Sequence, residues 1–350
     1  MGLALRIPAN DNAKKTFHRR GGDKNQRMAS HLITGVAGFI GSSIARELVH
    51  RGERVRGIDN FETGKQENIA SIRDRIEFVE ADIRDHDGLK DAFAGIDYVF
   101  HQAALPSVPL SVGDPVRAHN ININGTLNVL LAARDAKVKR VVYAASSSAY
   151  GETVTLPKRE DMMPNPVSPY AVQKLTGELY MQCFSRVYGL ETVSLRYFNV
   201  FGPHQDPGSP YSGVIAKFIT QMLEGDSPTI FGDGETSRDF TYIDNAVQAN
   251  LLAASAPAEA VSGQVFNIGV ARQISLNQTF QALREITGFR GAAKYAPQRV
   301  GDVKHSLANI ARAQKAFNYS PDVDFEEGLR RTVAWYKLRP HPTPAASTAI

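Results

Sequence analysis

The sequence predicts an α/β protein with a doubly wound parallel sheet, and its length of 350 residues indicates two domains or lobes. Short apolar segments alternate with segments in which apolar residues recur at helical spacing, and a glycine-rich turn joins the first strand to the first helix. In a parallel sheet of this kind, ligands bind at the carboxyl ends of the strands. The expected strands span 31–34, 54–59, 75–80, 97–100, 139–145 and 195–200, and the expected helices span 39–51, 87–93, 114–136 and 170–187.

The first turn reads GVAGFIG and places Gly35, Gly38 and Gly41 between the strand and the helix. The early glycines allow a tight turn in which backbone N–H groups approach a pyrophosphate, and the last allows close packing of helix and strand. The positive end of the helix then stabilises the phosphate charge. The turn therefore predicts a dinucleotide-binding domain of the Rossmann type. Glycine turns without a ligand are also common, so the prediction depends on the residues that follow.

Two acidic residues end later strands of the predicted sheet. Asp59 lies about 20 residues beyond the glycines, where a carboxylate accepts from both ribose hydroxyls of an adenosine and repels a 2′-phosphate. This position favours NAD over NADP. Asp82 follows the third strand, and it either accepts from the adenine amino group or caps the helix at 87–93.

The segment after the fourth strand, HQAALPSVPLS at 101–111, supplies small residues next to the same crevice. Ala103 and Ala104 let a cofactor lie against the backbone, while Pro106 and Ser107 are expected near the substrate. The helix that follows carries Asn122.

The chemistry is predicted just past the fifth strand. Ser146 begins a run of three serines at the carboxyl end of that strand, and Tyr170 and Lys174 share one face of the next helix. A phenol with an ordinary pKa of about 10 is a poor base at neutral pH, and an adjacent ammonium stabilises its phenolate. Tyr170 would take the proton of a sugar hydroxyl while the carbon beneath it gives hydride to a nicotinamide. Ser146 would hold the same oxygen.

Composition bounds the class of protein. The 350 residues are 43% hydrophobic, which is enough for a large core, and 40 basic against 36 acidic residues leave a net charge of +4. This balance does not indicate a nucleic-acid or membrane surface, and no apolar run approaches the ~18 residues of a membrane span. We expect a cytoplasmic protein. His101, His204 and His305 lack metal-ligand spacing, so no metal is expected.

The single cysteine, Cys183, cannot form a disulfide within the chain. It lies among Leu179, Phe184 and Val187, so we expect Cys183 on the buried face of a helix.

The motifs GVAGFIG, HQAAL, YAASSSAYG, SPYAVQK, LRYFNVFG, GDGETSRDF and RVGDVKHS together resemble those of the extended short-chain dehydrogenase/reductase family over residues 29–338. Within that family the chain is similar to nucleotide-sugar 4-epimerases that act on UDP-N-acetylglucosamine and UDP-glucose. The resemblance implies a smaller C-terminal α/β lobe and a homodimer formed through the helix that carries Tyr170 and Lys174 and the long helix before it. The expected division is a disordered extension at 1–28, an NAD-binding domain at 29–200 with 239–270, a UDP-sugar-binding lobe at 201–238 with 271–338, and a tail at 339–350.

The resemblance also implies two sets of site residues. The NAD contacts expected are Gly35, Gly38, Phe39, Ile40, Gly41, Asp59, Asn60, Asp82, Ile83, Gln102, Ala103, Ala104, Asn122, Tyr170, Lys174 and Tyr197. The UDP-sugar contacts expected are Pro106, Ser107, Ser146, Ser147, Ser148, Asn199, Gly213, Val214, Lys217, Thr229, Phe231, Arg238, Arg299, Asp302 and Ser306.

Within the family, the residues after the fifth strand separate reactions. Sugar 4,6-dehydratases carry Thr-Asp-Glu where this chain has three serines from Ser146, and decarboxylases keep a Glu at the position of Ser148. The resemblance therefore implies an NAD-dependent UDP-hexose 4-epimerase that stops at a 4-keto sugar and reduces it again. Ser306 stands where epimerases limited to UDP-glucose and UDP-galactose have a bulky tyrosine, so UDP-GlcNAc and UDP-GalNAc are expected substrates too.

Two alternatives remain at this point. One is a UDP-sugar dehydratase or decarboxylase of the same family, which the missing carboxylates oppose. The other is a non-catalytic NAD-binding regulator, and the presence of both Tyr170 and Lys174 opposes it.

Overall fold

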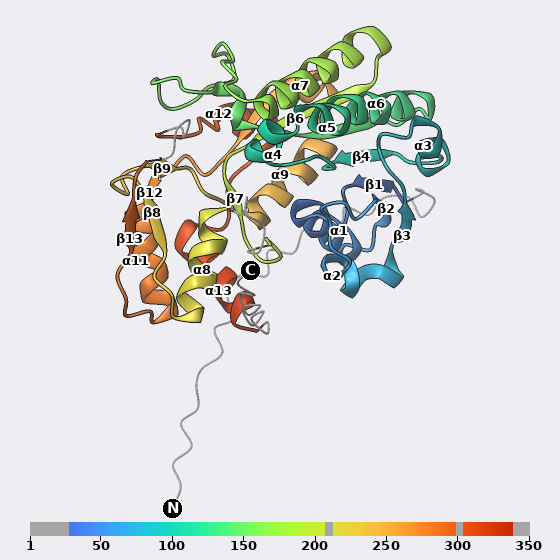
Figure 1. The fold of residues 1–350 in the computed structure, drawn as a ribbon. Coiled ribbons are helices and arrows are strands. Elements are labelled where there is room, and N and C mark those ends of the chain that lie inside the picture. Colours follow the sequence, from blue (N-terminus) through green and yellow to red (C-terminus); the bar gives the residue numbers. More distant parts are fainter. Residues whose placement is uncertain (1–27, 207–212, 299–303, 339–350) are drawn as a thin grey trace, which may run out of the picture.

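A computed structural model describes residues 28–206, 213–298 and 304–338. The expected extension at 1–28, apart from Met28, and the tail at 339–350 lie outside these residues. Within the described part of the chain, seven parallel strands form the central sheet in the order β11-β6-β5-β4-β1-β2-β3 (Figure 1). The strands are β1 (Ser30–Thr34), β2 (Arg54–Asp59), β3 (Glu77–Glu80), β4 (Tyr98–His101), β5 (Arg140–Ser146), β6 (Glu191–Tyr197) and β11 (Gln264–Ile268).

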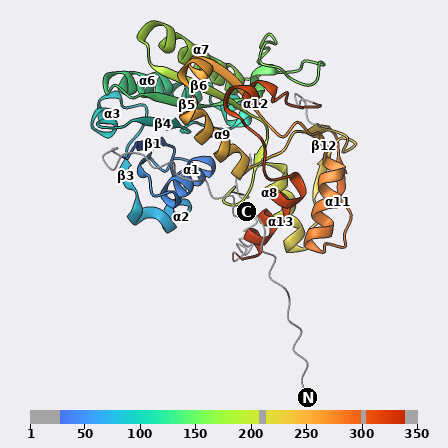
Figure 2. The same ribbon diagram turned by 180° about the vertical axis from the view of Figure 1, so that it is seen from behind.

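Helices cover both faces of this sheet, which confirms the doubly wound α/β fold (Figures 1 and 2). Successive residues of a strand point to opposite faces. Leu32 of β1 therefore packs in one core, with α3 (His86–Phe93), α6 (Gly125–Asp135) and α7 (Pro169–Tyr188), and Ile33 packs in the other. The second core contains α1 (Phe39–His50) and α9 (Ile243–Ser255). Apolar strands are buried on both faces because helices supply both layers.

The core of the α1 and α9 face continues into the smaller C-terminal lobe, which contains Phe218, Phe280 and Leu329. β11 lies beside β6, so the chain returns from the lobe to the sheet. The exact domain boundaries stay a prediction. The remaining elements are α2 (Gln66–Ile69), β7 (Val200–Phe201), α8 (Val214–Glu224), β8 (Thr229–Phe231), β9 (Ser237–Arg238), β10 (Thr241–Tyr242), α10 (Ala258–Val261), β12 (Ile274–Ser275), α11 (Leu276–Thr287), β13 (Lys294–Ala296), α12 (Ala311–Phe317) and α13 (Phe325–Lys337).

Three expected elements differ from the sequence prediction. The helix at 114–136 is α5 (Pro115–His119), a π-helical turn at Asn120–Asn124 and then α6, with a separate α4 (Val108–Gly113) before it. The third strand begins at Glu77 because a 3₁₀ turn occupies Ala70–Arg75. The sixth strand ends at Tyr197, since Asn199 has a φ of +24° that interrupts extended pairing before β7.

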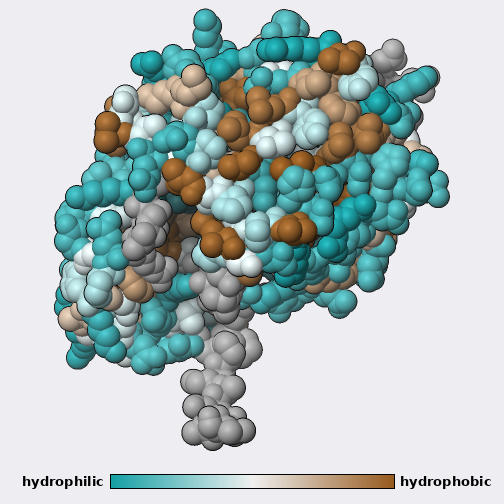
Figure 3. All heavy atoms as spheres, turned by 45° about the horizontal axis from the view of Figure 1, so that its top comes forward, coloured by the Kyte–Doolittle hydropathy of each residue, from teal (hydrophilic) through white to brown (hydrophobic). Residues whose placement is uncertain are grey.

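The outer face of α7 corrects the prediction for Cys183, which is exposed. Leu179 and Val187 are 57% and 66% exposed, so this apolar stripe faces away from the core. Figure 3 brings the top of Figure 1 forward and shows apolar side chains gathered over this part of the molecule. The predicted helix is confirmed, but helical spacing alone does not indicate which face of the helix is buried. Among the described helices, none combines the length and apolar character needed to cross a membrane.

Candidate active site

The predicted site residues meet at the carboxyl edge of the sheet. Parallel strands bring their carboxyl ends to one edge, although the residues are far apart in sequence. Six predicted site residues lie at or just beyond these carboxyl ends. In the spatial order of the strands, starting from the edge strand β3, they are Asp82 after β3, Asp59 in β2, Gly35 after β1, Gln102 after β4, Ser146 in β5 and Tyr197 in β6.

The glycine turn has the shape that a diphosphate needs. Gly35 has a φ of +71°, and a Cβ there would lie 2.7 Å from the backbone nitrogen of Ala103. A Cβ at Gly41 would lie 2.1 Å from the carbonyl oxygen of Gly35. Gly38 is the N-cap of α1 and provides no side-chain hydrogen bond to the first turn. The N-terminus of α1, with Phe39 and Ile40, is thus open to an anion.

A pocket beside this turn collects the predicted adenosine residues. Asp59 lies in its wall, and the carboxylate accepts from the backbone N–H of Ala37 at 2.9 Å and of Phe61 at 2.8 Å. Burial raises the pKa of Asp59, and these backbone hydrogen bonds oppose the rise. The pocket is lined by Gly35, Ile58, Asp59, Asn60, Glu62, Thr63, Ala81, Asp82, Ile83, Ala103, Ala104, Leu105 and Ile121.

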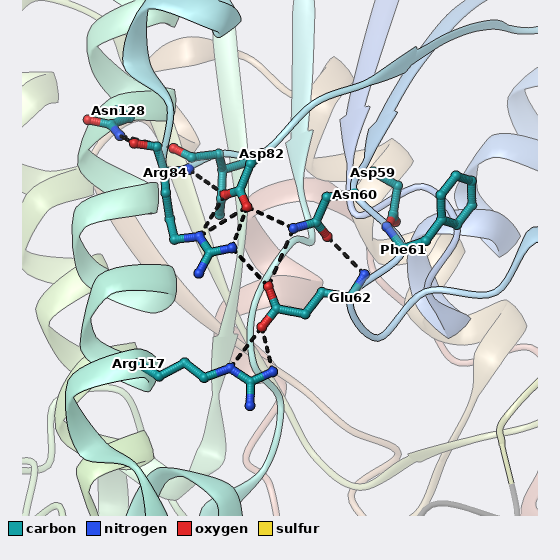
Figure 4. Close-up of polar contacts among 9 residues, drawn as sticks. Asp59, Asn60, Phe61, Glu62, Asp82, Arg84, Arg117 and Asn128 are labelled. Atoms are coloured by element: carbon teal, nitrogen blue, oxygen red, sulfur yellow. Dashed lines mark hydrogen bonds and ion pairs between the residues drawn. The ribbon is translucent and has the colours of Figure 1, made fainter.

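Asp82 lines the pocket and does not cap α3, so that alternative was wrong. The N-cap of α3 is Asp85, whose carboxylate accepts from Gly88 N–H at 3.2 Å. The Asp82 carboxylate instead accepts from Arg84 and from Asn60 Nδ2, the latter at 2.8 Å (Figure 4). Chiefly because of the hydrogen bond from Arg84, the pKa of Asp82 is lowered to about 2.

Two expected ligand contacts already have structural partners. The Asn122 side chain is buried and bonds both the N–H of Leu105, at 2.8 Å, and Gln173 Oε1 of α7, also at 2.8 Å. Ser107 caps α4 by accepting from Leu110 N–H at 3.2 Å. Asn122 and Ser107 therefore help to hold the segment 103–107 in place. Direct contact of either residue with a ligand stays a prediction, and so does contact of Pro106, which is exposed.

Tyr170 lies in the first turn of α7, near Ser146 at the end of β5. Ser168 caps this helix, and the backbone N–H of Tyr170 donates to Ser111 Oγ at 3.0 Å, a contact the sequence did not suggest. Burial raises the pKa of Tyr170, and a hydrogen bond with Ser146 lowers it. A phenolate at Tyr170 therefore needs nearby positive charge in addition to Ser146.

Lys174 is buried one turn further along α7. Its Nζ donates to the carbonyl oxygen of Ala144 at 2.8 Å. Burial lowers the pKa of Lys174 to about 7, while the nearby Glu178 carboxylate raises it. The Lys174 ammonium thus lies beside β5, and its protonation changes in the physiological range.

Tyr197 belongs to a polar triangle that sequence reasoning found only in part. Gln102 Nε2 donates to the Tyr197 hydroxyl at 3.3 Å, and Asn250 Nδ2 of α9 donates to the same oxygen at 2.8 Å. Burial raises the pKa of Tyr197 to about 12, so it stays a neutral phenol. Asn250 lies in α9 and is fully buried in the protein interior. A polar residue on the buried face of an apolar helix was the signal that could have indicated it.

The predicted substrate residues of the lobe are placed on several short elements. Gly213 precedes α8, which carries Val214 and Lys217; Thr229 and Phe231 lie in β8; and Arg238 lies in β9. Ser306 is next to β9, because its N–H donates to the carbonyl of Ser237 at 3.1 Å. Arg299 and Asp302 lie outside the described residues. Contact of any of these residues with substrate stays a prediction.

In the part of the chain that the structure describes, no group of three His, Cys, Asp or Glu residues is placed to hold a metal ion. His101, one of the histidines considered, is buried between Thr34 and Thr126, with which its ring nitrogens make contacts of 2.7 and 2.9 Å. Burial lowers the pKa of His101 to about 3, so it remains neutral.

The model of the NAD dependent epimerase/dehydratase family matches residues 31–269. The chain belongs to this NAD-dependent family. It is 38% identical over 311 residues to the UDP-glucose 4-epimerase of Mycolicibacterium smegmatis, covering 87% of this chain and 98% of the relative. More distant relatives of this NAD-dependent epimerase/dehydratase family carry the names UDP-glucuronate 4-epimerase, at 35% identity, and UDP-N-acetyl-alpha-D-glucosaminuronate decarboxylase, at 32%.

Two solved structures of family members share the fold. The UDP-glucose 4-epimerase of Thermotoga maritima with UDP-glucose gives a TM-score of 0.84 at 40% identity, covering 88% of this chain and 98% of that one. The UDP-N-acetylglucosamine 4-epimerase of Methanobrevibacter ruminantium, in complex with UDP-N-acetylmuramic acid, gives 0.84 at 41%, covering 89% and 99%. The relatives thus share the fold and differ in substrate.

The residues of this chain fit NAD, its family's cofactor. Gly35 and Gly41 occupy positions where a Cβ would collide with backbone, and the pocket beside them ends in the carboxylates of Asp59 and Asp82. The match to the NAD-dependent family confirms the expected cofactor. The individual NAD contacts stay predictions.

We predict that Lys174→Met makes the NAD-free protein more stable, and that this gain falls as pH rises. The pKa of Lys174 is about 7 when folded and near its ordinary value of 10.5 when unfolded, so between these values the unfolded chain binds more protons. The stability of the parent therefore rises with pH from 7 to 10.5, and that of the variant lacks this rise. Below pH 7 the gain should be on the order of a few kcal/mol.

Urea unfolding at pH 6.5 and pH 9.5 measures this difference. Lys315→Met, at an exposed lysine, is the control for loss of a surface charge. An equal gain at both pH values would contradict the lowered pKa of Lys174.

Proposed function

We propose that the protein is a UDP-hexose 4-epimerase that interconverts UDP-GlcNAc with UDP-GalNAc and UDP-Glc with UDP-Gal. One observation carries the proposal: Tyr170 and Ser146 meet at the end of β5, beside buried Lys174, and the residues following Ser146 are serines. Ser148 Oγ donates to Ser146 Oγ at 2.8 Å, so the neighbour of the catalytic serine is a hydroxyl and not a carboxylate.

Each of these residues has a role in moving one proton. Ser146 holds the 4-hydroxyl oxygen of the sugar, and Tyr170 takes the proton from that oxygen. Lys174 supplies positive charge that favours the phenolate. NAD, held at the glycine turn and Asp59, would supply the hydride acceptor and donor for C4. After the 4-keto sugar has turned over, Tyr170 gives the proton back to the oxygen of the opposite epimer.

The alternatives within the family need an additional acid or base. Elimination of water from the sugar requires a second proton-transfer pair, and the serines at 146–148 lack a titrating group in the useful range. A non-catalytic regulator would have no need for a buried lysine next to the tyrosine, since burying its charge is costly. The epimerase proposal therefore gives Tyr170, Lys174 and Ser146 each a role.

The sugar range is proposed from Ser306. In one of its two orientations the 4-keto sugar would turn its C2 substituent toward this residue. A serine leaves room for an N-acetyl group, whereas a tyrosine would overlap it. Ser306 belongs to the segment beside β9, near Arg238, which we propose contacts the UDP-sugar.

We further propose that the protein is a homodimer through α7. Leu179, Cys183 and Val187 form an exposed stripe on this helix, and Val172 continues it. A second copy would cover this stripe and remove its apolar area from water. The cytoplasmic location expected from the sequence stays a prediction.

Tyr170→Phe should retain NAD and fold while losing turnover by about 10²–10⁴-fold, because the base is removed and little volume changes. The parent and the variant are incubated separately with UDP-GlcNAc, UDP-Glc and UDP-glucuronate, and the products are resolved chromatographically. Turnover of the variant within about threefold of the parent would identify another base. Release of CO₂ or loss of water by the parent would replace the epimerase proposal with its family alternative.

Ser306→Tyr should remove activity on the acetylated sugars while the UDP-Glc/UDP-Gal pair is still interconverted. The measurement is the ratio of kcat/KM for UDP-GlcNAc to that for UDP-Glc, expected to fall at least tenfold because the ring occupies the N-acetyl volume. Ser306→Ala is the matched control, since it adds no bulk. An unchanged ratio in the tyrosine variant would show that Ser306 is not the gate.

Leu179→Glu should convert the dimer to a monomer, because a carboxylate would be buried without a partner in the interface. Light scattering coupled to size-exclusion chromatography gives the mass. Leu338→Glu, at another exposed leucine, controls for added charge. A dimer that survives the change at Leu179 would place the interface elsewhere.

A further inference from the structure

Glu62 lies in the wall of the adenosine pocket, in the loop between β2 and α2. Its side chain is 22% exposed, so most of it is covered by neighbouring residues. Its own backbone N–H donates to Asn60 Oδ1 at 3.0 Å, which fixes the start of the loop. Glu62 is not among the residues that the sequence suggested for NAD.

Both carboxylate oxygens of Glu62 bind groups from other elements (Figure 4). Oε1 accepts from Nε and Nη2 of Arg117 on α5, at 2.9 and 2.6 Å. Oε2 accepts from Nη2 of Arg84 at 3.0 Å and from Nδ2 of Asn60 at 3.4 Å. The loop after β2 is thereby joined to α5 and to the segment after β3.

The second of these connections closes a ring of polar contacts. Arg84 Nε donates to both oxygens of Asp82, at 2.9 and 3.0 Å, and Asn60 Nδ2 reaches Asp82 at 2.8 Å. The positive charges of Arg84 and Arg117 thus balance the negative charges of Glu62 and Asp82. Since Asn60, Glu62 and Asp82 all line the adenosine pocket, this ring runs along its rim.

We propose that Glu62 and Arg117 form a clasp across the adenosine pocket that slows the release of NAD. Glu62 lies at the pocket, and Arg117 is a positioning residue that acts through it. The loop after β2 must move away before adenosine can leave, and it cannot do so until the two hydrogen bonds from Arg117 to Glu62 Oε1 break. This inference concerns how the cofactor is held and does not depend on which sugar the enzyme uses.

The clasp suits an enzyme that regenerates NAD within each cycle and has no need to exchange it. Ion pairs at this exposure contribute little to folding stability, so a rate of NAD release is a better measure than a melting temperature. Exposed charges are also screened by salt. NAD release from the parent should therefore become faster as ionic strength rises.

The test measures NAD release from purified holoprotein, in which released NAD is reduced at once by excess alcohol dehydrogenase and ethanol and followed at the absorbance of NADH. Glu62→Gln and Arg117→Gln should each release NAD about tenfold faster than the parent, which corresponds to about 1.4 kcal/mol in the barrier. The double variant should be no faster than Glu62→Gln, because Arg117 acts only through Glu62. Arg117→Lys should restore much of the parent rate by keeping the charge.

The salt dependence and a matched control complete the experiment. The acceleration by salt should be reduced in the Gln variants, and Glu326→Gln, which removes the exposed pair with Arg272 on another part of the molecule, should leave NAD release unchanged. If a variant purifies without NAD, its affinity for added NAD is measured instead, with weaker binding expected. Parent-like release in both Gln variants, or independent effects that multiply in the double variant, would overturn the clasp.

Discussion

The buried ion pair between Glu178 of α7 and Arg196 of β6 holds α7 in place against the sheet. Their two parallel contacts, at 2.9 and 2.8 Å, join side chains that are almost completely buried. Burial raises the pKa of Glu178, and the guanidinium group opposes the rise. A shift of α7 along the sheet would separate these charges in a dry interior, which is strongly unfavourable. The ion pair therefore fixes the position of Tyr170 along the sheet relative to Ser146.

The same helix approaches the sheet unusually closely. A Cβ at Gly177 would lie 2.2 Å from the hydroxyl of Tyr143 on β5, so a larger residue would push α7 outward. The close approach also buries Lys174 and lowers its pKa. Beside Tyr170 the charged Lys174 is thus buried, with a pKa near the physiological range, whereas at the pocket after β2 the pair of Glu62 with Arg117 is partly exposed.

Features set by neighbours in the chain were predictable from the sequence. The glycine turn could be recognised because Gly35 and Gly41 must sit between a strand and a helix, and the comparisons confirm the NAD-dependent family and the fold. The π-helical turn at Asn120–Asn124 and the break at Asn199 were not predictable, since tertiary packing overrides local preference there. Cys183 was assigned to the wrong face because periodicity finds a stripe without saying what covers it.

By itself, the sequence determined the type of fold, the cofactor and the residue types available for proton transfer. These features depend on local spacing. The phosphate site needs a strand, a turn and a helix in succession, and Tyr170 and Lys174 share one helix face because they are four positions apart. Only the tertiary structure decided that Asp82 binds the side chain of Asn60, and that Glu62 binds Arg117 of α5. Those partners come from separate strands and helices, and the parallel sheet brings them together at one edge.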